Sequence, residues 1–175
     1  PLDMRFNMDS DFSAYDVINS YKETDLVRIF SEYGEERFSK RIAKKIIETR
    51  TKSPIRTTQE LSNLIIAAVP RIKSSIHPAT RVFQAIRIEV NDELRLIEKT
   101  LPLIPKVLKP GGRVAIITFH SLEDRLVKRY FKEATEYGEE SELEIITKTP
   151  IIAGANELVI NPRSRSAKLR AAKRR

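Results

Sequence analysis

The chain has 175 residues, a formal net charge of +8, and a composition that is 41% hydrophobic and 32% charged, which suits one ordinary domain with a core but not two large ones. No apolar run approaches the ~20 residues of a membrane-spanning helix, and the first residues lack the apolar stretch of a signal peptide, so we expect a cytoplasmic protein without membrane association. Cysteine is absent and histidine occurs only at His77 and His120, so we expect no disulfide and no metal site.

The positive charge lies in two blocks. Residues 37–87 hold 12 basic and 2 acidic residues, and residues 163–175 hold 7 basic and no acidic ones, whereas the other two segments are net acidic. Clustering of this kind favours a surface that binds a polyanion such as nucleic acid. The alternative is a solvated basic face together with a disordered tail.

Helical spacing dominates residues 24–100. After a mixed, turn-like segment at 1–12, apolar residues at 16–30 predict two short helices broken near 22–24. Thr57 or Thr58, supported by Glu60, is expected to cap a helix that ends before Pro70. A long periodic stretch follows His77, which we interpret as a helix-start residue, and runs to residue 101.

Residues 37–50 form the clearest amphipathic helix. On a helical wheel, one half is apolar and should dock on a core. The other half is basic and should face solvent. The basic half, which we predict to bind RNA, consists of Arg37, Lys40, Arg41, Lys44 and Lys45.

The pattern changes after the turn at residues 110–112. The continuous apolar run at 114–119 predicts a strand buried on both faces, as in a parallel α/β sheet. Ser121 is expected to cap a helix over 122–133, and residues 143–147 read as another strand. Residues 166–171 form either a third strand or a frayed tail. The chain is therefore predicted to join a helical module to a small α/β part.

The strand–helix junction at 119–125 is the best candidate site, because ligands of open α/β sheets bind beyond the carboxyl ends of the strands. It brings together the side chains of Phe119, His120, Ser121, Glu123, Asp124 and Arg125. The alternative is a plain turn in which Ser121 caps the helix and the acids face its positive end. That alternative leaves Phe119 and His120 unexplained, so we favour a functional site.

Two further clusters could bind RNA, and no cofactor cradle is present. Arg81, Gln84 and Arg87 carry groups that suit phosphates and base edges, although a surface helix explains them too. Arg163 and Arg165 alternate with serine and could contact successive phosphates from an extended backbone.

The five glycines form no G-x-G-x-x-G or Walker pattern, so we assign no cofactor-binding residue to this chain.

Five segments occur in the order found in one enzyme family. They are PLDMRFNMD, YGEERFSKRIAKKI, HPATRVFQAIRIEVNDEL, LKPGGRVAIITFHSLEDRLVKRYF and NPRSRSAKLRAAKR. The chain resembles the ribosomal RNA small subunit methyltransferase H family. The resemblance implies methyl transfer from S-adenosylmethionine to N4 of a cytosine in the decoding region of 16S rRNA, within the small ribosomal subunit. The implied fold is a helical insertion domain plus the C-terminal part of a Rossmann-like sheet.

Family members begin with a methyltransferase half that carries a glycine loop, whereas PLDMR occupies residues 1–5 here. The resemblance therefore implies the C-terminal portion of such an enzyme. Residues 1–23 would connect to the other half, residues 24–100 would form the substrate-side domain, and residues 101–175 would supply the last strands, helices and a basic tail. Residues 114–119 would then have an open edge, from which we expect a homodimer or a soluble aggregate.

The resemblance also implies roles at the junction. Phe119 would stack on the target base, and His120 or Asp124 would be the catalytic polar contact. Ser121 and Arg125 would bind the RNA substrate beside them. An aspartate in the family's L-D-L-G motif, which this sequence lacks, is an alternative group for orienting the amine. Two non-enzymatic hypotheses stay open: an RNA-binding module, and a helical interaction domain whose basic blocks serve solubility.

The missing glycine loop yields a testable prediction. This chain by itself should bind S-adenosylmethionine poorly and should transfer no methyl group, because nothing in it cradles the donor. Isothermal titration calorimetry of the purified chain measures this directly. Binding with micromolar affinity would refute the prediction.

Overall fold

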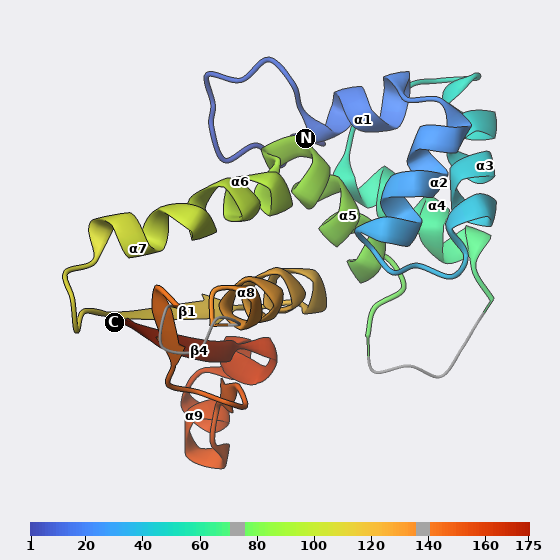
Figure 1. Ribbon diagram of the computed structural model, residues 1–175. Helices are drawn as coiled ribbons and strands as arrows, with labels where there is room; N and C mark the ends of the chain where they lie inside the picture. The colour runs from blue at the N-terminus through green and yellow to red at the C-terminus, as the bar shows by residue number, and fades with distance from the viewer. Residues whose placement is uncertain (71–75, 136–140) are drawn as a thin grey trace. The chain divides into compact units, whose positions relative to one another are not determined.

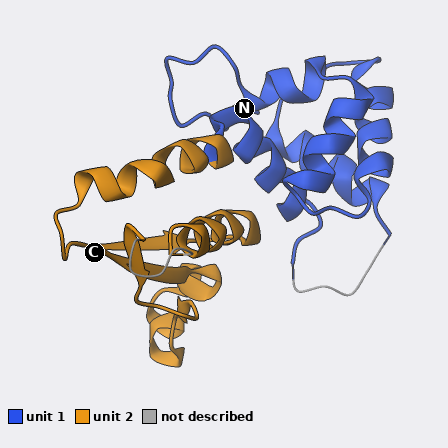
Figure 2. Ribbon diagram, viewed as in Figure 1, with its two compact units in different colours: residues 1–93 blue, residues 94–175 orange. Residues whose placement is uncertain are grey.

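The computed structural model describes residues 1–70, 76–135 and 141–175, and it divides into two compact units. Unit 1 comprises residues 1–93 and unit 2 comprises residues 94–175 (Figure 2). Residues 71–75, which fall within the predicted helical stretch 24–100, lie outside the described residues. None of the helices in the described part is long and apolar enough to cross a membrane.

Unit 1 is helical, as predicted (Figure 1). Its helices are α1 (Ala14–Ser20), α2 (Glu23–Glu32), α3 (Ser39–Arg50), α4 (Thr58–Ala68) and α5 (Thr80–Asn91). The fully buried large side chains of its core include Val17, Ile18, Leu26, Ile29, Phe30, Ile42, Ile46, Leu61, Ile65 and Ile86. Because Leu2 and Ala14 are buried in the same core, residues 1–23 are part of unit 1.

The predicted start of α4 is confirmed. The Thr57 hydroxyl accepts a hydrogen bond from the backbone N–H of Glu60 at 3.1 Å. In return the Glu60 carboxylate accepts bonds from the N–H groups of Thr57 at 3.1 Å and Arg56 at 2.7 Å. This reciprocal pair satisfies donors that the first turn of a helix would otherwise leave open.

The predicted long helix after His77 is broken at Asp92, which adopts a left-handed conformation with φ of 54°. The Asn91 side chain is bonded at the same point to the loop near the start of unit 1. It donates to the carbonyl of Met4 at 2.9 Å and accepts from the N–H of Phe6 at 2.7 Å. The break escaped prediction because the apolar spacing continues across it.

Unit 2 combines short helices with a small antiparallel sheet (Figure 1). Its elements are α6 (Glu93–Thr100, beginning at the end of unit 1), η1 (Leu101–Leu103), α7 (Ile104–Val107), β1 (Arg113–Thr118), α8 (Ser121–Glu133), β2 (Leu143–Ile145), β3 (Ile151–Ile152), α9 (Ala155–Ile160), η3 (Pro162–Ser166) and β4 (Lys168–Arg174). Strand β4 pairs with β1, β2 and β3. The segment near 166–171 is therefore the central strand, and the alternatives of a frayed or disordered tail are wrong.

The prediction for β1 is corrected in two respects. The strand pairs antiparallel with β4, with Ile116 opposite Arg170, rather than lying in a parallel sheet. It is also buried on one face only: Val114 and Ile116 pack against the core of unit 2, whereas Ile117 is 55% exposed. An unbroken apolar run does not reveal this, because residue type alone cannot say whether the second face is covered.

Gly34 provides a test of the packing in unit 1. A Cβ atom at this position would lie 2.7 Å from the carbonyl oxygens of both Phe30 and Arg81. Because both obstacles are backbone atoms, Gly34→Ala should destabilise the protein by about 1–3 kcal/mol in chemical denaturation.

The matched control is Gly154→Ala, because a Cβ there meets nothing within 4 Å. Because Gly154 is the N-cap of α9, where glycine is preferred to alanine, the control should cost about 0.5 kcal/mol, less than Gly34→Ala. Equal effects of the two substitutions would contradict the tight approach at Gly34.

Candidate functional site

The junction between β1 and α8 is organised by His120 and Glu123. His120, rather than the predicted Ser121, is the N-cap of α8, since its Nδ1 accepts from the backbone N–H of Glu123 at 3.4 Å. The Glu123 carboxylate accepts in turn from the N–H groups of Phe119 at 2.7 Å and His120 at 3.3 Å. An accepting Nδ1 places the hydrogen of a neutral imidazole on Nε2.

The electrostatics of this cap follow from its bonds. Burial acts to raise the pKa of Glu123, but the bonds from His120 and from the Phe119 backbone outweigh it and leave that pKa below its ordinary value. A carboxylate therefore already neutralises the positive end of α8. Nε2 of His120 is buried 3.3 Å from Glu123 Oε1, and within the described chain it has no hydrogen bond of good geometry.

Asp124 joins α8 to the central strand. Its carboxylate accepts from Arg170 Nε at 2.7 Å and Nη2 at 3.2 Å, and from Lys168 Nζ at 3.3 Å. The hydrogen bond from Arg170 holds the pKa of Asp124 below its ordinary value, against the opposing effect of burial. Asp124 and Arg170 are 8% and 7% exposed, so this is a buried ion pair. A catalytic role for Asp124 or His120 stays a prediction.

Phe119 is the exposed aromatic residue of the junction. Its side chain is 52% exposed immediately after β1, and Ser121 and Arg125 also lie on the exposed side of the first turns of α8. The structure therefore brings an accessible aromatic ring next to a buried imidazole. The predicted contacts of Phe119, Ser121 and Arg125 with RNA stay predictions.

The cluster on α5 makes contacts inside unit 1. Arg81 Nη1 donates to the carbonyl of Glu35 at 3.1 Å, and Gln84 Nε2 donates to the carbonyl of Tyr33 at 2.9 Å. Arg81 and Gln84 thus hold the connection between α2 and α3.

Arg87 and His77 also have partners within unit 1. Arg87 binds both carboxylate oxygens of Glu93, at 2.7 and 3.0 Å. Contacts of this kind within unit 1 do not test RNA binding, so the RNA-binding role of the α5 cluster stays a prediction. His77 Nδ1 accepts from the N–H of Ala79 at 3.2 Å, which agrees with the interpretation of His77 as a helix-start residue.

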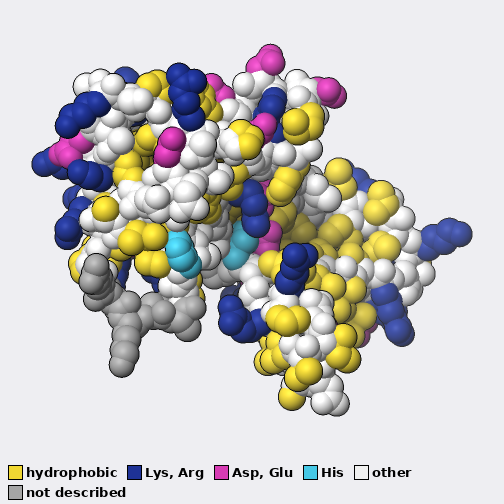
Figure 3. All heavy atoms as spheres, turned by 180° about the vertical axis from the view of Figure 1, so that it is seen from behind, with side chains coloured by type: hydrophobic (Ala, Val, Ile, Leu, Met, Phe, Trp, Pro, Cys, Tyr) yellow, Lys and Arg dark blue, Asp and Glu magenta, His cyan; other side chains and the backbone are white. Residues whose placement is uncertain are grey.

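The basic half of α3 is solvent-exposed, as predicted. Lys and Arg side chains gather along one side of unit 1 (Figure 3). The helix begins at Ser39 rather than at the predicted residue 37, so its exposed cations are Lys40, Arg41, Lys44 and Lys45, and the exposed Arg37 lies just before it. On the opposite side of the helix, Ile42, Ala43 and Ile46 are fully buried.

The C-terminal basic block differs from the prediction. Arg163 and Arg165 lie in the 3₁₀ helix η3, not in an extended backbone, and the hydroxyl of the buried Ser164 donates to the carbonyl of Asn161 at 2.7 Å. Both arginines are exposed. The basic residues of β4 instead bind within unit 2: Lys168 and Arg170 to Asp124, Lys173 to Glu144, and Arg174 to the carbonyl of Leu108.

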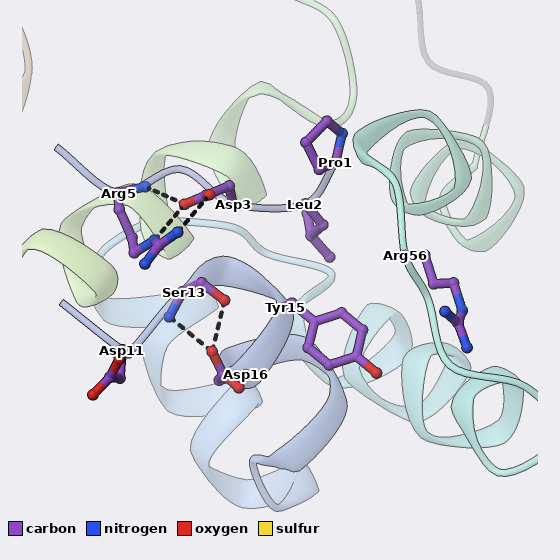
Figure 4. Close-up of a pocket in the computed structure, with 9 residues that line it drawn as sticks. All are labelled: Pro1, Leu2, Asp3, Arg5, Asp11, Ser13, Tyr15, Asp16 and Arg56. Carbon is purple, nitrogen blue, oxygen red and sulfur yellow. Dashed lines mark hydrogen bonds and ion pairs between the residues drawn. The ribbon is translucent and has the colours of Figure 1, made fainter. Parts of the chain in front are cut away.

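Unit 1 also has an open hollow of about 370 Å³ near the start of the chain (Figure 4). Two bonded pairs lie on its wall: Arg5 with the carboxylate of Asp3 at 2.7 and 2.9 Å, and the Ser13 hydroxyl with Asp16 at 2.6 Å. The bond from Arg5 lowers the pKa of Asp3 to about 2. The sequence predicts no role for these side chains, although Asp3 and Arg5 belong to the PLDMR segment.

The glycines show whether this chain has a cradle for a nucleotide-like cofactor. A Cβ at Gly112 would meet the carbonyl of Lys109 at 2.8 Å, and Gly34 is equally close to protein backbone. Gly111 and Gly154 face open space. Among the four glycines that the structure describes, the two tight positions are explained by the protein's own backbone, so the glycines give no sign of the cradle that S-adenosylmethionine would need.

Comparison with known proteins gives a match along the whole chain. Residues 1–175 match the MraW methylase family. "Ribosomal RNA small subunit methyltransferase H" of Acaryochloris marina is 52% identical over 99% of this chain and 56% of its own length. The proteins of that name from Caldicellulosiruptor bescii and Deinococcus deserti are each 51% identical over 99% of this chain, and over 60% and 56% of their own lengths. The chain thus spans little more than half the length of these curated relatives.

The ion pair between Asp124 and Arg170 predicts a pH-dependent stability. Because the folded-state pKa of Asp124 lies below its ordinary value of 3.8, the stabilisation is present above that pH and is lost as the pH falls through the folded-state pKa. Asp124→Asn should cost about 3 kcal/mol near neutral pH, since it leaves a buried guanidinium without its counter-ion.

The difference in unfolding free energy between the unsubstituted protein and Asp124→Asn should shrink as the pH falls below 3.8. Urea denaturation at several pH values measures it. Glu133→Gln is the control, because Glu133 belongs to an exposed 3.9 Å pair with Arg129 and should change stability little. A penalty for Asp124→Asn that does not vary with pH would contradict this account.

Proposed function

The chain belongs to the MraW methylase family, and on that premise we propose that it serves the methylation of ribosomal RNA. The observation that carries the proposal is the match over residues 1–175, together with relatives about half identical that are named ribosomal RNA small subunit methyltransferase H. The proposed reaction transfers a methyl group from S-adenosylmethionine to N4 of a cytosine in the decoding region of 16S rRNA.

We further propose a division of labour along the chain. Residues 24–100 act as the helical substrate-side domain, residues 1–23 connect it to the methyltransferase part, and residues 101–175 complete a Rossmann-like sheet. Family membership and the strand–helix unit of β1 and α8 support this assignment. A homodimer through the outer edge of β1 stays a prediction. In the described part of the chain, β1 has β4 as its strand partner.

The chemistry of the proposed reaction sets what the residues must do. The amino group of cytosine is a weak nucleophile, because its lone pair is delocalised into the ring, so an enzyme must extrude the base, hold the amine in line and accept its hydrogen bonds. The exposed ring of Phe119 suits stacking on an extruded base. S-adenosylmethionine supplies the methyl group in the proposed reaction.

The bonds at the junction limit the candidate catalytic groups. Asp124 already accepts three bonds from Arg170 and Lys168, which reduces its capacity to accept from the amine. His120 accepts at Nδ1 from the backbone, so its neutral ring offers a donor and not an acceptor at Nε2. The amine acceptor is therefore proposed to lie in the part of the relatives that this chain does not span.

A non-catalytic RNA-binding module is the second candidate function. The observation that favours it is the exposed cationic face on α3. The two functions differ in one outcome. Only a methyltransferase portion can restore methylation when it replaces the matching part of a family enzyme.

A chimera tests the proposal. Residues 1–175 replace the matching segment of the Acaryochloris marina relative, and radiolabel transfer from S-adenosylmethionine to small ribosomal subunits is measured. The chimera should methylate 16S rRNA at cytosine N4. Phe119→Ala in the chimera should lower kcat/KM by roughly 10- to 100-fold, which corresponds to the loss of one stacking contact.

Phe119→Tyr is the matched control, because it keeps the ring and should retain activity. Mapping of the labelled nucleotide distinguishes cytosine N4 from other positions. A chimera that binds S-adenosylmethionine and yet transfers no label to rRNA would overturn the proposal.

A further inference from the structure

The outer side of α3 presents a fixed array of positive charge. The helix cannot turn about its axis, because Ile42, Ala43 and Ile46 on the inner side are fully buried in the core of unit 1. The exposed positions are therefore set by the fold. They are Lys40, Arg41, Lys44, Lys45 and Glu48, four cations and one carboxylate, and the exposed Arg37 lies just before the helix.

Few of these cations are neutralised by partners in the described part of the chain. Lys45 makes a weak pair with Glu48 at 3.9 Å, on a surface where such pairs contribute little. In the described ranges, Lys40, Arg41 and Lys44 have no ion-pair partner. Lys40 and Lys44 lie one turn apart, about 6 Å along the helix axis, and Arg41 and Lys45 repeat the same step.

Within the described segment 37–52, the outer side of α3 offers no exposed ring on which a base could stack. Phe38 is the one aromatic residue in the segment 37–52, its side chain is half-buried, and the guanidinium of Arg37 lies 4.7 Å from its ring centroid. Proteins that hold single-stranded nucleic acid combine positive charge with exposed aromatic platforms in a groove. The outer face of α3 is instead a convex row of cations.

We propose that this face of α3 binds the phosphate backbone of double-helical RNA. The inference rests on the proposed function and adds to it the form of RNA that unit 1 recognises. A duplex carries charge on two strands, so it presents phosphates more densely than a single strand does. A-form RNA hides its base edges in a deep, narrow groove, so proteins recognise it by shape and backbone, for which aliphatic stems with charged tips suffice.

Fluorescence anisotropy with the full chain tests the proposal. The probes are a labelled 20-base-pair RNA duplex and one of its strands alone, titrated at several potassium chloride concentrations. The duplex should bind several-fold more tightly than the single strand. Lys40→Ala combined with Lys44→Ala should reduce the slope of log K against log salt for the duplex by about 2, one for each lost phosphate contact.

The control removes the same charge elsewhere. Lys106→Ala combined with Lys109→Ala changes two exposed lysines of unit 2 and should leave the slope unchanged. A single strand that binds as tightly as the duplex, or α3 variants whose slope matches the control, would overturn this inference and leave the proposed function standing. Failure of the chain to bind either RNA would count against the proposed function as well.

Discussion

The buried ion pair between Asp124 and Arg170 is the interaction on which unit 2 depends. Arg170 belongs to the strand that pairs with all three others, and Asp124 belongs to the first turn of the helix that follows β1. A guanidinium without a counter-ion at this depth would be strongly unfavourable, so helix and sheet are fixed relative to one another. The position of Phe119 and His120, between β1 and that helix, follows from this connection.

The helices of unit 1 could be predicted because their apolar residues recur with helical spacing and their ends carry recognisable residues such as Thr57 and Glu60. The break at Asp92 could not, since it depends on a left-handed backbone and on bonds to a segment more than eighty residues away. The central strand was also ambiguous. Its lysines and arginines are equally typical of a basic tail. In the structure their partners are Asp124 on α8, Glu144 on β2 and the backbone carbonyl of Leu108.

In the candidate site too, residue types could be read from the sequence, but the contacts that those residues make could not. Arg81 and Lys44 are both cations in the basic block, and the sequence alone treats them alike. The structure separates them, because Arg81 binds a backbone carbonyl in the connection between α2 and α3, whereas Lys44 projects from the exposed side of α3. A carbonyl partner leaves no signature in the sequence, so the distinction could not have been predicted.

The order of strands in unit 2 has a consequence for how the chain is made. Fifty residues separate Thr118 at the end of β1 from Lys168 at the start of β4. At about 5–20 residues per second, a ribosome needs roughly 3–10 seconds to synthesise that stretch. By the end of this interval β1, β2 and β3 have been synthesised, but β4, the strand that pairs with each of them, has not. Unit 2 therefore folds late, while the locally connected helices of unit 1 can already assemble.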